Sequence, residues 1–143
     1  MNVTYTEYQS DDQGNCPIEE LVSFLHQHLE QYGDDQASIR KAIQYIFNDR
    51  GGHVYTQKVD GELSGVVVIN KTGMEGYIPE NILVYIALNP AFRGKGLGKA
   101  LMQRAIEQTN GDIALHVEKD NPAKFLYEKL GFTNPYLEMR LRK

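Results

Sequence analysis

Apolar residues recur every three or four positions in four parts of the chain, which is the spacing of a helix with one buried face. In the first part, Leu21, Leu25 and Leu29 follow a proline and two glutamates, residue types that favour the first turn of a helix. Glycine follows each of the three later parts, as is typical where a helix ends. The pattern predicts helices at residues 17–29, 36–50, 96–110 and 122–130.

Apolar runs between these helices predict strands. Val54–Val59 and Leu63–Ile69 are joined by Asp60-Gly61, a dipeptide that favours a two-residue hairpin turn. Ile82–Leu88 is a continuous apolar run that ends at Asn89-Pro90. Further strands are expected at residues 3–8, 113–117 and 136–141. The order β-αα-βββ-α-β-α-β predicts an α+β sandwich, a mixed α/β fold around one sheet, with a single domain over residues 1–143.

Composition narrows the class of protein. The formal net charge of −4 at pH 7 argues against non-specific nucleic-acid binding. No apolar run approaches the length of a membrane span, and the first four residues lack the basic and apolar regions of a secretory signal. A single cysteine, Cys16, excludes an internal disulfide. We therefore expect a cytoplasmic protein that binds neither nucleic acid nor membranes.

Charge is distributed unevenly along the chain. Residues 1–89 hold 5 Lys and Arg against 13 Asp and Glu, whereas residues 90–143 hold 10 against 6. This division favours an anionic ligand on one side of the molecule and a cationic ligand on the other, although an ordinary solvated surface explains it equally well.

The segment Arg93-Gly94-Lys95-Gly96-Leu97-Gly98-Lys99 lies between an apolar strand and an amphipathic helix. Glycine lets the backbone approach a ligand closely, and the free amides at the start of a helix point toward that ligand. The amides, the positive end of the helix dipole and three cationic side chains together favour an anion. The segment therefore predicts a pyrophosphate site.

Two other glycine-rich motifs do not fit this segment. A P-loop needs a longer interval between its glycines and a hydroxyl residue after its lysine, where Ala100 stands. The dinucleotide fingerprint needs a third glycine at the position of Lys99. A glycine-rich turn that only packs remains as the structural alternative.

Two motifs carry a resemblance to a known family. Arg93-x-x-Gly96-x-Gly98, after a strand that ends in Leu88-Asn89-Pro90, resembles the acyl-CoA signature of the GCN5-related N-acetyltransferase (GNAT) family. The run Leu115–Phe132, which ends in Tyr-Glu-Lys-Leu-Gly-Phe, is similar to the family's fifth strand and following helix. The resemblance covers roughly residues 80–132 and implies a mixed sheet with a splayed parallel strand pair. The family usually ends in a two-strand hairpin, which residues 133–143 are too short to form in full, so the hairpin is expected to be shortened.

The resemblance implies acetyl-CoA as co-substrate and no metal. The pyrophosphate would then rest on the amides of the Arg93–Lys99 loop. Asn121 is implied to contact the pantetheine, although a helix cap explains this residue equally well, and Lys124 is a further candidate for the pantetheine or the 3′-phosphate. The pantetheine arm is expected to pair with the strand backbone at Ile86, Ala87 and Leu88.

The resemblance also suggests catalytic roles. Tyr127 is the expected general acid for the departing thiolate, with a core tyrosine as the structural alternative. The backbone amide of Leu88 is expected to meet the oxyanion of the tetrahedral intermediate. Glu80, at the start of the apolar strand, is the first candidate for the general base, followed by Glu75 and Tyr85.

The sequence thus predicts direct transfer of an acetyl group from acetyl-CoA to a primary amine of an unidentified small molecule or peptide, without a covalent enzyme intermediate. The acidic first part of the chain points weakly to a cationic acceptor. The alternatives are a non-catalytic module that binds or senses acyl-CoA, and transfer of a longer acyl chain. A homodimer is compatible with the resemblance, but no segment of the sequence indicates an interface.

Overall fold

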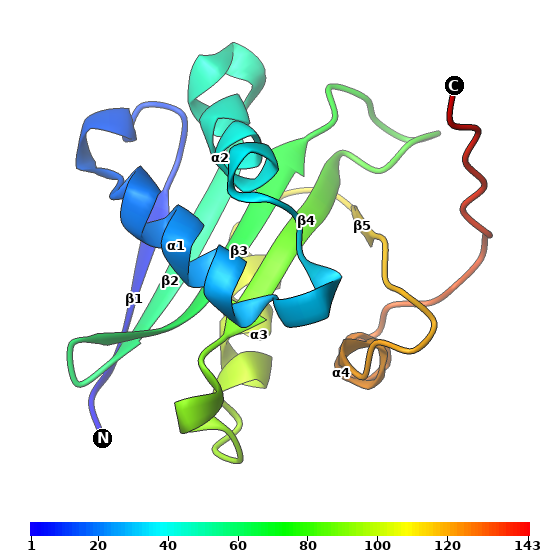
Figure 1. The fold of residues 1–143 in the computed structure, drawn as a ribbon. Helices are drawn as coiled ribbons and strands as arrows, with labels where there is room; N and C mark the ends of the chain where they lie inside the picture. Colours follow the sequence, from blue (N-terminus) through cyan, green and yellow to red (C-terminus); the bar gives the residue numbers. More distant parts are fainter.

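A single five-stranded sheet organises the chain, and the computed structural model describes all residues from 1 to 143 (Figure 1). The strands are β1 (Val3–Tyr8), β2 (Gly52–Val59), β3 (Glu62–Lys71), β4 (Asn81–Leu88) and β5 (Ile113–Leu115), and they lie in this order across the sheet. The helices are α1 (Ile18–His28), α2 (Gln36–Tyr45), α3 (Leu97–Gln108) and α4 (Ala123–Lys129). No helix is long and apolar enough to cross a membrane, since even α3 has only 12 residues.

A hairpin turn and a helix cap form where short sequence motifs predict them. Between β2 and β3 the chain turns at Asp60 and Gly61, whose φ angles of 50° and 84° are both left-handed, as a type I′ hairpin turn requires. Asp35 caps α2, because its side chain accepts a hydrogen bond from the Ser38 amide at 2.7 Å. The predicted α+β sandwich is confirmed.

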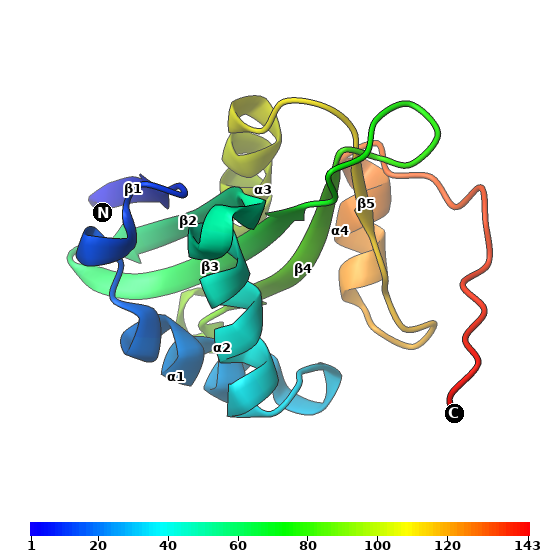
Figure 2. The same cartoon turned by 90° about the horizontal axis from the view of Figure 1, so that it is seen from above.

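Two helices cover each face of the sheet (Figure 2). On one face α1 and α2 pack against β2, β3 and β4 around the buried side chains of Leu25, Ile43 and Val68. On the other face α3 and α4 enclose a second apolar cluster that includes Leu101, Met102 and Tyr127. Burial of these two faces is the main source of stability, since each buried aliphatic side chain contributes about 1.5–3 kcal/mol.

The sheet changes character at β4. Strands β1 to β4 are antiparallel, but β4 and β5 are parallel and pair at only three positions, the last of which joins Leu83 and Leu115. The register between β3 and β4 shifts at this level and leaves Val84 without a partner on β3, which is a β-bulge. Beyond it β4 continues to Leu88 while β5 turns away, as Figure 1 shows. The splayed parallel pair is therefore present, and its opening starts at the bulge.

Polar contacts fix the closed end of this parallel pair. The buried side chain of Asn81 donates to the carbonyl oxygens of Asn110 at 2.7 Å and Asp112 at 3.2 Å. Glu80 Oε1 accepts a hydrogen bond from the Asp112 amide at 3.0 Å, beneath the turn made by Gly111. These contacts hold β5 beside β4 before the two strands separate.

The C-terminal part of the sequence prediction was wrong in one element. Residues 136–141 form no strand, and the predicted strand at 113–117 is shortened to Ile113–Leu115. The tail alternates as a strand would, yet no neighbouring strand accepts its backbone, and Leu137, Met139 and Leu141 are 81–91% exposed. Alternation shows that a segment can form a strand, whereas a partner decides whether it does.

We expect Asn81→Ala to destabilise the fold, because it removes the buried side-chain donor to the Asn110 carbonyl oxygen and leaves the Asp112 carbonyl oxygen with only the Asn81 backbone amide. The free energy of unfolding in urea should fall by about 1–3 kcal/mol. Asn110→Ala is the matched control, since Asn110 contributes only its backbone carbonyl to this contact and its side chain is exposed. Equal stability of the two variants would contradict the role given to Asn81.

Candidate functional site

The glycine-rich loop forms the start of α3 with its amides unpaired. Gly94 and Gly96 have left-handed φ angles of 82° and 71°, and nothing lies within 4 Å of the side-chain position at either residue. Gly96 caps α3, and no side chain caps the helix in its place. The first hydrogen bond within the helix runs from the Ala100 amide to the Gly96 carbonyl oxygen. The amides of Leu97, Gly98 and Lys99, which lie between these two residues, therefore have no partner within the helix. The loop thus presents an open face of backbone donors at the positive end of a helix.

A hollow of about 140 Å³ lies against these donors. One wall is formed by the loop and the other by the ends of β3 and β4, including Ser64, Leu88 and Asn89. Gly98 lets the helix approach β4 this closely, because a Cβ on it would lie 2.5 Å from Leu88 Cδ1. The hollow therefore joins the helix start to the open end of β4.

Backbone groups on β4 face the opening between β4 and β5. The Asn89 amide donates to the Ser64 carbonyl on β3, and pairing in an antiparallel ladder alternates. Ile86 and Leu88 therefore direct their N–H and C=O groups away from β3, toward the side that β5 has left. Ala87 directs its groups to Val66 on β3. Of the three residues predicted to pair with a ligand, two are free to do so and Ala87 is not.

The cationic side chains of the loop are exposed and differ in their contacts. The Arg93 guanidinium lies 3.9 Å from the Glu30 carboxylate, a surface ion pair that contributes little to stability. The Lys95 ammonium lies 5.9 Å from the centre of the Phe92 ring. Lys99 is exposed on the first turn of α3. All three can therefore turn toward an anion at low cost.

Tyr127 lies on α4 in the apolar cluster that also contains Leu83 and Leu115, the last residues paired between β4 and β5. Its side chain is 7% exposed and meets the Phe132 ring edge-on at 5.9 Å between centroids. Its hydroxyl bonds to no protein atom, yet no fully enclosed polar side-chain atom lacks a partner, so the hydroxyl reaches solvent. Burial, and to a lesser degree the charge of Glu118, raise the pKa of Tyr127 to about 12.

The two remaining predicted ligand contacts lie before and within α4. Asn121 Oδ1 accepts a hydrogen bond from the Ala123 amide at 3.0 Å, which is the contact of a helix cap. The side chain of Lys124 is exposed on the first turn of α4. The structure thus assigns Asn121 a structural contact and leaves its predicted contact with a ligand as a prediction.

The three candidates for a general base differ in their contacts. Glu80 lies at the closed end of the parallel pair, and the hydrogen bond from the Asp112 amide lowers the pKa of its carboxyl group. Glu75 is exposed on the connection between β3 and β4. The Tyr85 hydroxyl donates to Asp34 Oδ2 at 2.5 Å, and burial raises its pKa. The geometry gives Glu80 and Tyr85 structural contacts, and the identity of the general base stays a prediction.

Sequence reasoning missed a buried polar group beneath the loop. Gln57 on β2 is fully buried, and its Nε2 donates to the Leu97 carbonyl oxygen at 2.9 Å. Ser64 Oγ lies 2.8 Å from Gln57 Oε1. A glutamine inside a predicted strand was the one available signal in the sequence.

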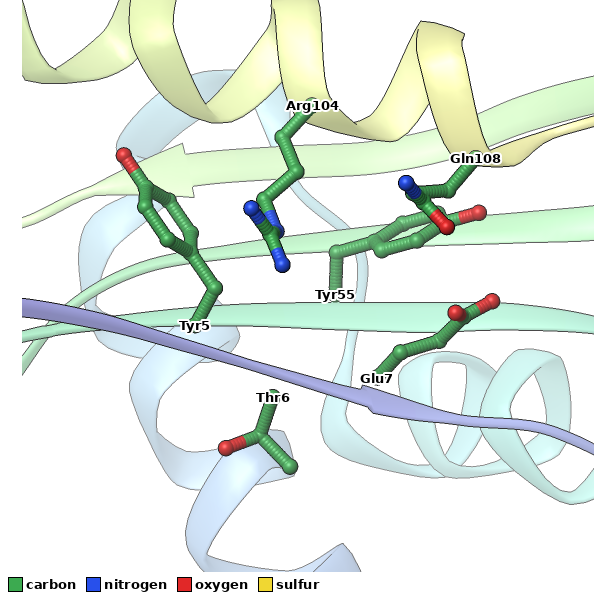
Figure 3. A pocket seen from close by; sticks show the side chains of 6 residues that line it. All are labelled: Tyr5, Thr6, Glu7, Tyr55, Arg104 and Gln108. Carbon is green, nitrogen blue, oxygen red and sulfur yellow. The ribbon is translucent and has the colours of Figure 1, made fainter.

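A smaller hollow of about 40 Å³ lies elsewhere on the same face of the sheet, between β1, β2 and α3 (Figure 3). Arg104 projects from α3 into it, between the rings of Tyr5 and Tyr55. It shares no residue with the hollow at the glycine loop. Across the molecule, no three side chains of His, Cys, Asp or Glu are grouped so that they could hold a metal ion.

Comparison with known proteins decides the family. A model of the acetyltransferase (GNAT) family matches residues 17–132. The chain belongs to this family. The predicted family and its fold, with the splayed strand pair and the glycine loop at a helix start, are thus confirmed.

Several acetyltransferases are similar to the chain over different shares of its length. The chain is 28% identical over 132 residues to mycothiol acetyltransferase of Streptosporangium roseum, which is 92% of this chain and 33% of that protein. It is 37% identical over 70 residues to the ribosomal protein bS18-alanine N-acetyltransferase of Haemophilus influenzae, 46% of this chain and 45% of that one. A predicted acetyltransferase with acetyl-CoA from Clostridium acetobutylicum superposes with a TM-score of 0.68 at 16% identity, over 97% of this chain and 96% of that structure. The chain thus spans less than half the length of the two curated relatives, the mycothiol and the bS18-alanine acetyltransferases.

We expect Tyr127 to remain protonated far above neutral pH. The folded protein should hold this proton until about pH 12, whereas the unfolded chain releases it near its ordinary pKa of about 10. The contribution of Tyr127 to stability is therefore present below about pH 10 and is lost as the pH rises through 12. An absorbance titration of tyrosinate, taken as wild type minus Tyr127→Phe, should show one tyrosine that ionises near that upper value. A difference curve centred near pH 10 would contradict it.

Proposed function

We propose that this GNAT protein transfers an acetyl group from acetyl-CoA directly to a primary amine. One observation carries the proposal: the free backbone edge of β4 at Ile86 and Leu88 runs into the hollow beside the unpaired amides that start α3. The edge fits an extended, amide-bearing chain, and the helix start fits a diphosphate. Pantetheine and pyrophosphate are joined in that order in CoA. The acetyl-CoA in the Clostridium acetobutylicum relative supports this choice of donor.

The donor would lie along β4 with its thioester toward the bulge. The amides of Leu97, Gly98 and Lys99 would receive the diphosphate, and Arg93 and Lys95 would add charge from the loop. Pantetheine amides would pair with Ile86 and Leu88 as an added strand. Asn121 and Lys124 are proposed to contact the donor from the start of α4, in addition to the cap contact that Asn121 makes.

The reaction requires an attacking amine and a protonated leaving group. The amine nitrogen forms a bond to the thioester carbon, and the carbonyl oxygen takes up negative charge that a free backbone amide of β4 near the bulge would stabilise. The Leu88 amide, which the sequence predicted for this role, lies at the diphosphate end of β4 and would pair with the pantetheine instead. Collapse of this intermediate breaks the carbon–sulfur bond, and the Tyr127 hydroxyl protonates the departing thiolate. The amine proton leaves to water, and a proton from solvent restores Tyr127. A phenol with a pKa near 12 is fully protonated at neutral pH, as this role requires.

The acceptor is proposed to be a primary amine without a required second positive charge. The argument from sequence for a cationic acceptor was the acidic first part of the chain, especially Asp34, Asp35, Glu75 and Glu80, and three of these four carboxylates have partners in the protein. Asp34 accepts from Tyr85, Asp35 caps α2, and Glu80 accepts from the Asp112 amide, whereas Glu75 is exposed. The N-acetyltransferase acting on alanine of ribosomal protein bS18 supports transfer to an amine nitrogen.

Tyr127→Phe tests the proposed chemistry, because it removes the proton donor and keeps the ring that packs on Phe132. Turnover of acetyl-CoA, measured as thiol release with a panel of primary amines, should fall about 10²-fold or more, while the Kd for CoA in calorimetry stays within about twofold. Tyr32→Phe serves as control, since its hydroxyl bonds only to the Asp120 carbonyl on the surface.

Each outcome of this test has a distinct meaning. Binding of CoA without turnover on any amine would favour a binding or sensing module over an enzyme. Unchanged turnover in Tyr127→Phe would remove Tyr127 as the acid while leaving the transfer reaction in place. Absence of CoA binding by the wild type would refute the proposed function.

A further inference from the structure

We propose that Gln57 is a positioning residue that sets the diphosphate site by holding the first turn of α3 in place from inside the sheet. The inference rests on the proposed function, because it concerns the site where the diphosphate of CoA would bind. Gln57 lies on β2, two strands away from β4, and has no exposed surface through which to touch a ligand.

The hydrogen bond from Gln57 reaches α3 at Leu97, in the turn that presents the unpaired amides. Its Nε2 lies 2.9 Å from the carbonyl oxygen of Leu97, the first residue of α3. Leu97 also supplies one of the unpaired amides at the helix start and lines the hollow beside it. A shift of this turn would therefore move the amides that are to receive the diphosphate.

Ser64 fixes the orientation of the Gln57 amide. Its hydroxyl oxygen lies 2.8 Å from Gln57 Oε1 and 3.0 Å from the Gln57 carbonyl oxygen. The Leu97 carbonyl can only accept, so the amide must turn its NH2 group toward Leu97 and its oxygen toward Ser64. The side chain is thereby held at both ends of its amide group.

A second contact extends this group to the middle of α3. Gln57 Nε2 lies 3.2 Å from the Tyr5 hydroxyl oxygen, and the Arg104 guanidinium lies 4.8 Å from the centre of the Tyr5 ring (Figure 3). The register of β2 against β3 shifts next to Gln57 and leaves Ser64 on β3 without a partner, so β3 carries a β-bulge opposite Gln57. Bulges redirect individual side chains, and the extra residue of this bulge is the serine whose hydroxyl contacts the Gln57 amide.

Gln57→Met tests the proposal, because methionine matches the length of glutamine and lacks the donor. We expect the Kd for CoA to rise about tenfold and the Kd for pantetheine, which carries no diphosphate, to stay within about twofold of wild type. Thr56→Val is the matched control, since Thr56 is a buried neighbour on β2 that bonds to the Thr6 carbonyl on β1 and not to α3. It should lose stability without any change in the Kd for CoA.

Ser64→Ala gives a second test that does not depend on the folding of Gln57→Met. The variant frees the Gln57 amide to rotate, so its Kd for CoA should rise several-fold. In the double variant the two effects should not add, because Ser64 acts through Gln57. Additive effects, or an unchanged Kd for CoA in folded Gln57→Met, would overturn the inference and leave the proposed function standing. A wild-type protein that binds no CoA would refute both.

Discussion

The function proposed for this protein depends on a parallel strand pair that stops after three residue pairs. Up to Leu83, β4 pairs on both sides; beyond the bulge at Val84 it pairs only with β3. A strand edge left open inside a fold must find other hydrogen-bond partners. Here the opening continues into a helix start whose amides also lack partners. Together, the open strand edge and the helix start fit one elongated ligand that carries amides at one end and phosphates at the other.

Most of the structure serves to hold these two unpaired regions in a fixed relation. Asn81 and Glu80 tie β5 to β4 at the closed end, so the strands diverge from a defined point. Gly98 allows α3 to lie directly against Leu88 at the open end. The two apolar clusters support the sheet from both faces, which keeps β4 in place when one of its edges is unpaired.

The sequence predicted what local rules determine. The Asp60-Gly61 turn and the glycine loop at the start of α3 follow from backbone requirements of a few adjacent residues. Contacts between distant segments could not be predicted from the sequence. The side-chain amide of Gln57 donates to the Leu97 carbonyl oxygen 40 residues away, and the Asp112 amide donates to the Glu80 carboxylate 32 residues away. The position of Glu80 at the start of an apolar strand made it the first candidate for the general base, but the sequence carried no information on its contact with the Asp112 amide.

Two further differences have the same origin. The run Ile82–Leu88 looks uniform in sequence, so the bulge at Val84, which decides where the strands part, could not be located. The alternation of Tyr136–Leu141 predicted a strand, but strand formation needs a neighbour, and no strand of the sheet pairs with these residues. Residue-resolved amide hydrogen exchange with and without CoA tests the central claim most directly. The amides of Ile86, Leu88 and Leu97–Lys99 should exchange more slowly with CoA, while Ala87, already paired with Val66, should not change. Unchanged exchange at the amides of Ile86, Leu88 and Leu97–Lys99 in the presence of saturating CoA would contradict the account.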